Sequence, residues 1–244
     1  MKHIYQKNEL TFSLIWIVLY VVLFSAADSL SADLGTAKIL TAPLCAAITV
    51  FLTVWLLKNG LAEKYGLCKI KGKWKDYLCF LPLALIASTN LWRGFAMRFT
   101  PLETFLYVVS MLGVGFIEEI IFRGFLFKAL CRENLKRAVI ISSLTFGIGH
   151  IVNLLNGAEI LPTLLQVCYA CAIGFLFTVI FHRSGSLMPC IITHSAVNSL
   201  SAFAGDGSDG LAIATAAALT LVSLVYAVWI LKKGTHLPAK TAGR

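Results

Sequence analysis

The sequence predicts an all-α membrane protein with about eight transmembrane helices and a polar cavity within the membrane. The first observation is the composition: 58% of the 244 residues are hydrophobic and 14% are charged, whereas soluble chains carry roughly 25% charged residues. The second is that the apolar residues form long blocks of the length that a bilayer-spanning helix needs. The third is a cluster of charged residues inside one of these blocks, which predicts a polar site at membrane depth.

Eight apolar segments follow one another along the chain. A helix needs about 20 residues to cross the hydrocarbon core, and the fourth segment is longer, so we expect it to tilt or to extend into the cytosol. The first segment also resembles a signal peptide. A retained helix is favoured, because Glu9 weakens the basic lead and eight spans give a consistent charge pattern. The segments cover residues 10–27, 39–57, 77–95, 102–131, 137–154, 161–181, 187–204 and 211–231.

The net charge of +9 does not indicate nucleic-acid binding, because the basic residues gather in alternate loops, as the positive-inside rule describes. This alternation predicts a multi-pass protein of the cell membrane with both termini in the cytoplasm. Arg93 and Arg98 are the exception, since they fall in an outer loop. The basic stretches are residues 58–76, 128–137 and 232–244, and the mainly acidic loops are residues 28–38 and 206–210.

All seven cysteines are predicted to be free thiols that pack as small hydrophobic groups. Cys168 and Cys171 have CxxC spacing, but no second pair of that kind accompanies them, so helix packing is the preferred interpretation. The remaining cysteines are Cys45, Cys68, Cys79, Cys131 and Cys190.

The stretch from Gly113 to Gly124 places three charged residues inside an apolar segment. A charge at the bilayer centre costs about 2.5–3.5 kcal/mol on insertion scales, so these groups need partners. Glu119 and Arg123 are four residues apart and can form an ion pair along the helix. Glu118 points to a different helix face, and its partners must therefore come from other helices.

Two later segments each offer a pair of polar or aromatic side chains at helical spacing. Phe146 and His150 are four residues apart, as are His194 and Asn198, so each pair shares one helix face. Counted from the segment ends, Glu118 and the two histidines can reach a shared depth in the membrane. Of the other polar residues, Asn90, Gln166 and Thr178 are interpreted as helix-packing groups, and Asn153 and Asn156 as loop residues.

This combination of side chains suits hydrolysis. A carboxylate beside a histidine can take a proton from water, and a second histidine with an asparagine can donate hydrogen bonds to the oxyanion that forms when water attacks an amide. The same groups could instead ligate a divalent metal such as zinc, which lowers the pKa of bound water, although the sequence lacks HExxH. A third interpretation is a structural polar network that holds the helices together.

The three groups of residues resemble the motifs of a known family of intramembrane proteases, the CPBP family, also called the Abi or CAAX protease family. It includes the eukaryotic type II CAAX prenyl endopeptidases and many bacterial proteins linked to bacteriocin self-immunity. The resemblance covers about residues 100–205, with the motifs in the family's order. Residues Glu118 to Arg123 resemble its EExxxR motif, Phe146 to His150 its FxxxH motif, and His194 to Asn198 its HxxxN motif.

The resemblance implies an eight-span helical fold with a catalytic cavity in the bilayer that opens toward the cytosolic side. Whether a metal takes part stays open, although family members are often described as metalloproteases. The resemblance also divides the chain into N-terminal helices (1–100), a protease core (101–205) and a last helix with a basic tail (206–244). By similarity, Glu118 and His150 would activate water, His194 and Asn198 would form the oxyanion site, and Glu119 and Arg123 would support them.

The function predicted from the sequence is therefore an intramembrane endopeptidase that hydrolyses bonds in a peptide or protein substrate. The residues fix neither prenylation of that substrate nor a role in bacteriocin processing or self-immunity. The alternative is a non-catalytic immunity or scaffold protein that binds a peptide or a membrane partner in the same cavity. A proton-coupled transporter is disfavoured, because the sequence shows neither an inverted repeat nor a pair of broken helices.

Overall fold

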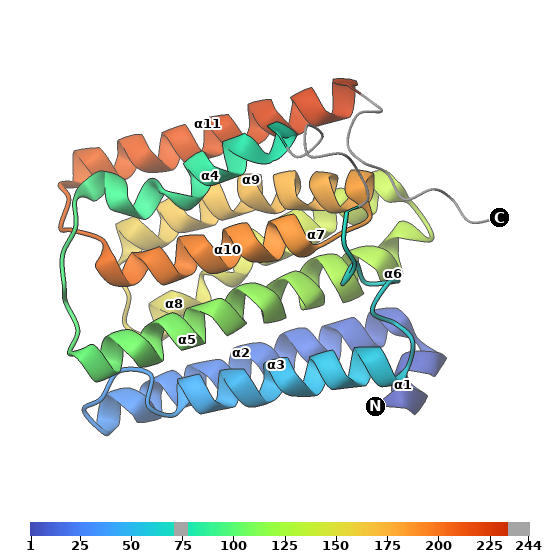
Figure 1. The fold of residues 1–244 in the computed structure, drawn as a ribbon, viewed down its shortest axis with the longest axis horizontal. Helices are drawn as coiled ribbons and strands as arrows, with labels where there is room; N and C mark the ends of the chain where they lie inside the picture. The colour runs from blue at the N-terminus through green and yellow to red at the C-terminus, as the bar shows by residue number, and fades with distance from the viewer. Residues whose placement is uncertain (71–77, 234–244) are drawn as a thin grey trace.

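The computed structural model describes residues 1–70 and 78–233, and these residues form helices and connecting loops without a named strand. The long helices run side by side in one bundle (Figure 1). Phe95 and Ala204 form an isolated antiparallel bridge between two loops. The predicted all-α fold class is confirmed. The predicted basic positions Lys71, Lys73 and Lys75, and the tail from residue 234, lie outside the described residues.

Most of the elements are α-helices, and three are of other types. Elements η2 and η4 are 3-10 helices, and η3 is a π-helix. In chain order they are α1 (Lys2–Lys7), α2 (Glu9–Asp33), α3 (Thr41–Lys58), α4 (Leu81–Ala87), η2 (Thr89–Arg93), α5 (Pro101–Glu118), η3 (Glu119–Phe127), α6 (Lys128–Cys131), α7 (Leu135–Gly149), α8 (Val152–Leu155), α9 (Ile160–Ser184), α10 (Met188–Leu200), η4 (Ser201–Phe203) and α11 (Asp209–Lys233).

Six helices of the described chain are long and apolar enough to cross a membrane. They correspond to six of the eight predicted segments, and the other two segments form shorter helices. The predicted third span is the apolar helix Leu78–Arg93, which changes from α to 3-10 geometry at Thr89 and ends at Gly94 with φ of 89°. The predicted seventh span is α10, which has 13 residues. The polytopic architecture is thus confirmed, while the predicted count of eight spans is not, because two of the segments form shorter helices.

The fourth span begins at a capping box that the local sequence specifies. The Thr100 side chain accepts a hydrogen bond from the Glu103 backbone N–H at 3.3 Å, and the Thr100 backbone N–H donates to Glu103 Oε2 at 3.1 Å. Pro101 occupies the first turn, where the helix needs no backbone donor. This start fixes the phase of the long helix that carries the intramembrane charges.

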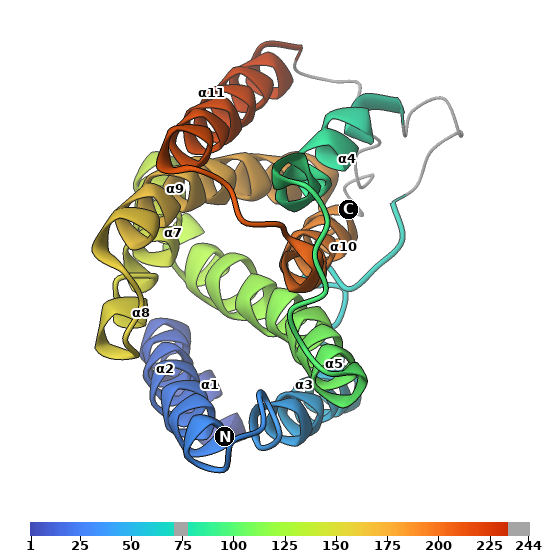
Figure 2. The same ribbon diagram turned by 90° about the vertical axis from the view of Figure 1, so that its left-hand side faces the viewer.

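The segment α5–η3 forms the centre of the bundle. Figure 2 shows α5 between α2 and α3 on one side and α7, α9 and α10 on the other. The side chains from Ile120 to Phe127 are at most 4% exposed where they are apolar, and Arg123 among them is fully buried. A π-helix is uncommon and is frequently found at functional sites. The charged residues therefore lie at the most enclosed part of the fold.

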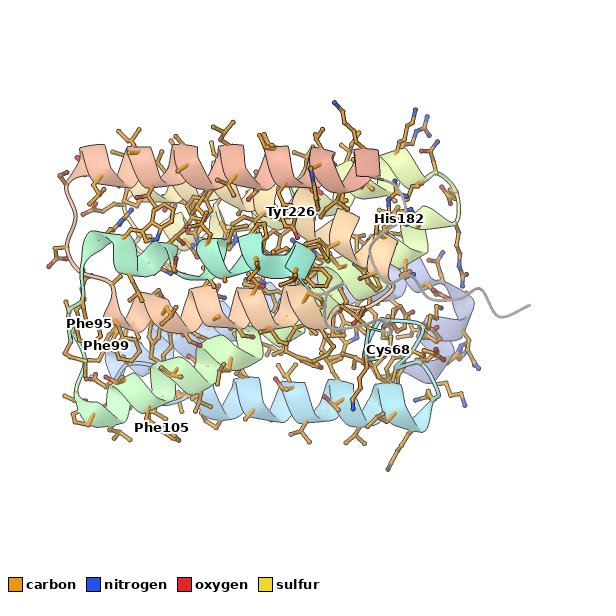
Figure 3. All side chains as sticks on the ribbon, turned by 45° about the horizontal axis from the view of Figure 1, so that its top comes forward. Cys68, Phe95, Phe99, Phe105, His182 and Tyr226 are labelled. Atoms are coloured by element: carbon orange, nitrogen blue, oxygen red, sulfur yellow. The ribbon has the colours of Figure 1, made fainter. Side chains whose placement is uncertain are left out.

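The two ends of the bundle differ in the elements that they contain. We call the end that holds α1, α6 and the last turn of α11 the basic end (Figure 1). The opposite end holds the loops at residues 34–40, 94–100 and 204–208. In Figure 3, Phe95 and Phe99 lie at the opposite end, whereas Cys68 and His182 lie toward the basic end.

Candidate active site

The structure brings the predicted charged and polar residues of three helices together in the bundle interior. Glu118 ends α5, and Glu119 and Arg123 follow in η3. The exposed fraction is 7% for Glu118 and 0% for Glu119 and Arg123. Buried charges of this kind are tolerated when they are paired with each other, and the contacts around them show how this is done.

The ion pair predicted between Glu119 and Arg123 is present. Arg123 Nη1 lies 3.0 Å from Glu119 Oε1, and both side chains are fully buried. The guanidinium carbon also lies 3.9 Å from the centre of the Phe146 ring, a distance at which a cation is attracted to the ring face. Phe146 therefore supports the arginine as well as carrying the FxxxH motif.

His194 lies between the two glutamates. Its Nδ1 is 2.8 Å from Glu119 Oε1, and its Nε2 is 3.3 Å from Glu118 Oε2. A Nδ1–H that donates to Glu119 fixes the tautomer and the orientation of the ring. This leaves Nε2 facing the Glu118 carboxylate. The sequence reasoning paired Glu118 with His150, and did not foresee that His194 contacts both carboxylates.

Tyr20 of α2 supplies a contact to Glu118 that the sequence reasoning missed. Its hydroxyl donates a hydrogen bond of 2.6 Å to Glu118 Oε1. Glu118 thus has partners from two other helices, as its isolated position on α5 predicted. Tyr20 lies within a long apolar segment and belongs to no motif, so its sequence context carries no signal of this role.

His150 follows directly after α7 and lines a cavity beside the glutamates. Its ring makes an edge-on contact with Phe146 at 5.3 Å between centroids, and Phe146 contacts His194 in the same way at 5.6 Å. Within the described residues no hydrogen bond is formed by the His150 ring. Because it also lines the cavity, the ring is available to a bound molecule.

Asn198 lies one helical turn after His194 on α10 and lines the same cavity. Its backbone carbonyl accepts a hydrogen bond from Ser201 at 2.6 Å. In the part of the chain that the structure describes, its side-chain amide makes no hydrogen bond. Like His150, Asn198 therefore presents an unused polar side chain at the cavity wall.

The cavity has a volume of about 380 Å³, which lies in the range of small-molecule binding pockets. Glu118, His150, His194 and Asn198 all line it. Several residues that were interpreted as packing or loop groups also form its walls. They include Asn90, which donates to the Val197 carbonyl at 2.6 Å; Asn153 and Gln166, which are joined by a hydrogen bond of 2.9 Å; and Asn156.

The cavity extends from the site toward the opposite end of the bundle. It includes Asp28 and Lys38 near the end of α2 and the start of α3, and Ser201 after α10. The resemblance implied an opening toward the cytosolic side, and the predicted orientation puts the basic end in the cytoplasm. If the basic end lies in the cytoplasm, the cavity extends away from the cytosol. The two expectations therefore cannot both hold for this cavity.

The donor set does not fit a metal centre. Among the described residues no group of three histidine, cysteine, aspartate or glutamate side chains is arranged to hold a metal ion. Both ring nitrogens of His194 already face carboxylate oxygens.

None of the seven cysteines, all within the described chain, forms a disulfide, as predicted. Cys45 and Cys190 are buried among the helices, whereas Cys168 is exposed and does not pack as predicted. Cys171 lies against α7, where a Cβ added at Gly147 would come within 2.2 Å of its sulfur. Helix packing is therefore the role of Cys171, as expected.

Comparison with known proteins identifies one family. Residues 99–200 match the family model described as Type II CAAX prenyl endopeptidase Rce1-like. No curated protein and no solved structure matches the chain. The matched segment begins just before α5 and ends with α10, so it contains Glu118, His150 and His194. The match confirms that this segment of the chain resembles a CAAX protease-like family.

Proposed function

We propose that the protein is an intramembrane endopeptidase in which Glu118 activates the attacking water. The observation that supports this most is the position of the Glu118 carboxylate, which is buried and held by Tyr20 and His194. It borders a cavity together with His150 and Asn198, whose side chains form no hydrogen bond within residues 1–70 and 78–233. A positioned base beside unused donors is the arrangement that hydrolysis requires.

In the proposed reaction, water enters the cavity and Glu118 takes its proton while the oxygen attacks the carbonyl carbon of the scissile bond. His150 orients the water. The oxyanion receives hydrogen bonds from Asn198 and from Nε2 of His194. When the intermediate collapses, the carbon–nitrogen bond breaks, and Glu118 returns the proton to the leaving nitrogen. The products are a carboxylic acid and an amine.

Glu119 and Arg123 act as positioning residues in this proposal. For His194 to donate from Nε2, the ring must carry a proton on both nitrogens. The Glu119 carboxylate, 2.8 Å from Nδ1, compensates the resulting positive charge, and Arg123 compensates the second carboxylate. Two carboxylates and two cations balance formally, which suits a site of low dielectric constant.

The substrate is proposed to be a peptide or protein segment, as the CAAX protease-like match suggests. Prenylated and unprenylated substrates both remain candidates, as do bacteriocin processing, self-immunity and protein maturation. The prenylated and plain members of the peptide library distinguish the first two of these alternatives.

The test is cleavage of a quenched fluorescent peptide library, with prenylated and plain members, by the purified protein in detergent. We expect the wild type to cleave. Glu118→Gln should lower the cleavage rate by about 10²–10⁴-fold, which is the range that a general base contributes. Glu103→Gln is the matched control, because the same change on the same helix lies at the capping box, outside the site. Full activity in correctly folded Glu118→Gln would refute the proposal.

A chelator arm addresses the metal. Because the described residues hold no three-ligand group, we expect cleavage to persist after treatment with a strong chelator and dialysis. Loss of cleavage that zinc restores would show that a metal takes part, and the assigned roles of the histidines would then be wrong.

A non-catalytic immunity or scaffold protein is the second candidate. One observation favours it: both oxygens of Glu118 already face protein groups, Tyr20 at 2.6 Å and His194 at 3.3 Å. A carboxylate so engaged could serve only to hold the cavity in shape. In that case Glu118→Gln would still bind the peptide or protect cells, and the wild type would cleave no member of the library.

A further inference from the structure

The cavity beside Glu118 extends in one direction. On α5 it is lined from Glu118 back to Tyr107, and on α2 from Tyr20 forward to Asp28. Because these helices run in opposite directions, both stretches lead from the site to the opposite end. The same holds for α9, where the lining residues start at Gln166. The cavity therefore reaches the end of the bundle that holds the loops at residues 34–40 and 94–100.

The basic end is closed by packed side chains. Tyr65, Phe125, Phe127, Phe181 and Leu187 are each at most 1% exposed. The ring of Phe125 makes an edge-on contact with that of Tyr65 at 5.0 Å, and the ring of Phe127 with that of Phe181 at 6.1 Å. None of these five residues lines the cavity.

A layer of polar side chains lies outside these five packed residues, farther from the cavity. Glu9 accepts hydrogen bonds from Lys64 at 2.7 Å and from Arg132 at 2.8 Å. These three residues tie α2 to the loop after α3 and to the end of α6. A substrate arriving from the basic end would therefore have to separate both these ion pairs and the five packed side chains beneath them.

The distribution of charge orients the bundle in the membrane. Basic residues in cytoplasmic loops set the topology of membrane proteins. At the basic end, the described loops and helix ends carry the basic residues Lys2, Lys7, Lys58, Lys64, Lys69, Lys128, Arg132, Lys136, Arg137, Arg183 and Lys232, and the acidic residues Glu9, Glu63 and Glu133. At the opposite end they carry Asp28, Asp33, Lys38, Arg93, Arg98, Glu103, Glu159, Asp206 and Asp209.

We propose that the site is entered from the extracytoplasmic side, and that its substrate is a peptide segment presented at the outer face of the membrane. This inference rests on the proposed peptidase function for the nature of the substrate, but the side of access follows from the cavity and the charges. It reverses the expectation, taken from the family resemblance, of an opening toward the cytosol.

The mouth of the cavity offers groups suited to a peptide. Lys38 and Asp28 form an ion pair of 2.8 Å at the cavity wall. Asn156, also at the wall, donates to Ser25 at 3.4 Å and so links α8 to α2. These side chains can exchange their hydrogen bonds for bonds to a peptide backbone as it enters.

The first test measures the side of access without using activity. Asn156→Cys at the mouth and Leu135→Cys at the basic end are each expressed in the full-length protein, with the wild type as background for the native cysteines. In intact spheroplasts, a membrane-impermeant maleimide–polyethylene glycol is expected to shift Asn156→Cys by one adduct. Leu135→Cys is expected to shift only after permeabilisation. The reverse pattern would overturn the proposal.

A second measurement asks whether the path reaches the site. Met111→Cys lines the cavity between its mouth and Glu118. A small charged methanethiosulfonate applied to intact spheroplasts is expected to block later labelling of this cysteine in detergent. If Met111→Cys is blocked only when the reagent is applied to inside-out vesicles, the cavity is reached from the cytosol and the proposal is wrong.

The third measurement compares cleavage in vesicles of defined orientation. A charged, membrane-impermeant quenched peptide that the wild type cleaves in detergent is expected to be cleaved by right-side-out vesicles and not by inside-out vesicles. Cleavage confined to inside-out vesicles would overturn the proposal. Absence of cleavage even in detergent would contradict the proposed function alone, and the labelling experiments would still decide the side of access.

Discussion

Arg123 is the largest fully buried side chain of the described chain, and its environment explains how a charge is kept there. The Glu119 carboxylate lies 3.0 Å away, and the aromatic rings of Phe146 and Phe177 lie 3.9 and 5.7 Å from the guanidinium carbon. A planar cation suits such a site better than the compact, strongly hydrated ammonium of lysine. The residue thus joins η3, α7 and α9 through one side chain.

Removing either member of this ion pair should be strongly destabilising. We expect Arg123→Met or Glu119→Gln alone to lower the free energy of unfolding by about 3–5 kcal/mol, because the remaining charge is left buried without its partner. The double variant should lose less than the sum of the two. A denaturation series in detergent of all four proteins measures the coupling, and additive losses would show that the pair does not act as a unit.

The sequence predicted the ion pair between Glu119 and Arg123, because the spacing of two residues along one helix determines whether they can meet. It could not predict the partners of Glu118. Tyr20 lies 98 positions away in the chain, and which face of α2 meets α5 depends on packing that no local pattern encodes. The same limit applies to His194, since its contact with both carboxylates depends on how closely α10 approaches the junction of α5 and η3.

Among the helices, two contacts are so close that they require glycine. A Cβ added at Gly115 would lie 2.6 Å from the Ser195 backbone nitrogen, and one added at Gly147 would lie 2.6 Å from the Cys171 backbone nitrogen. These glycines let α5 approach α10 and let α7 approach α9. The distance between His194 and the glutamates therefore depends on Gly115.

Gly147 and Gly149 provide a matched pair on one helix. We expect Gly147→Ala to lower the free energy of unfolding by about 1–3 kcal/mol, as overpacking does, because backbone atoms of α9 would have to move. Gly149→Ala meets no atom within 4 Å and should leave stability unchanged or raise it. Thermal unfolding of both variants in detergent makes the comparison, and equal losses would contradict the assigned contact.

The elements were predicted from apolar length, and this worked where a helix is continuous. The third and seventh segments also form helices close to the predicted bounds, Leu78–Arg93 and α10 followed by η4, but these helices are shorter than about 20 residues, so the count of eight spans is not confirmed. Hydropathy does not register their change to 3-10 geometry at η2 and η4. The π geometry of η3 was also not predicted, since no pattern in its nine residues distinguishes a π-helix from an α-helix.

Across the whole molecule, the site depends on helices outside the segment that matches the family. Residues 99–200 match, yet Tyr20, Val21 and Phe24 of α2 form one wall of the cavity. The N-terminal helices therefore complete the site, and the matched segment by itself lacks the partner that Tyr20 provides to Glu118.

A split chain tests this dependence. We expect the fragment 61–244 alone to cleave no peptide, and co-expression with the fragment 1–60 to restore cleavage, because the break falls in the turn after α3, where Gly60 has φ of 66°. Co-purification of the two fragments reports assembly separately from activity. Full cleavage by 61–244 alone would show that α2 is dispensable.

The shortness of the Leu78–Arg93 helix has a consequence for the surrounding lipid. Its 16 residues extend about 24–27 Å, because the last five form a 3-10 helix with a rise of about 2.0 Å instead of about 1.5 Å per residue, against a hydrocarbon core of about 30 Å. Leu81 and Leu85 on this helix are exposed on the bundle surface. We therefore expect the adjacent bilayer to thin around this helix, at a cost that rises with each ångström of hydrophobic mismatch. On this expectation, lipids with shorter acyl chains reduce the deformation and stabilise the protein.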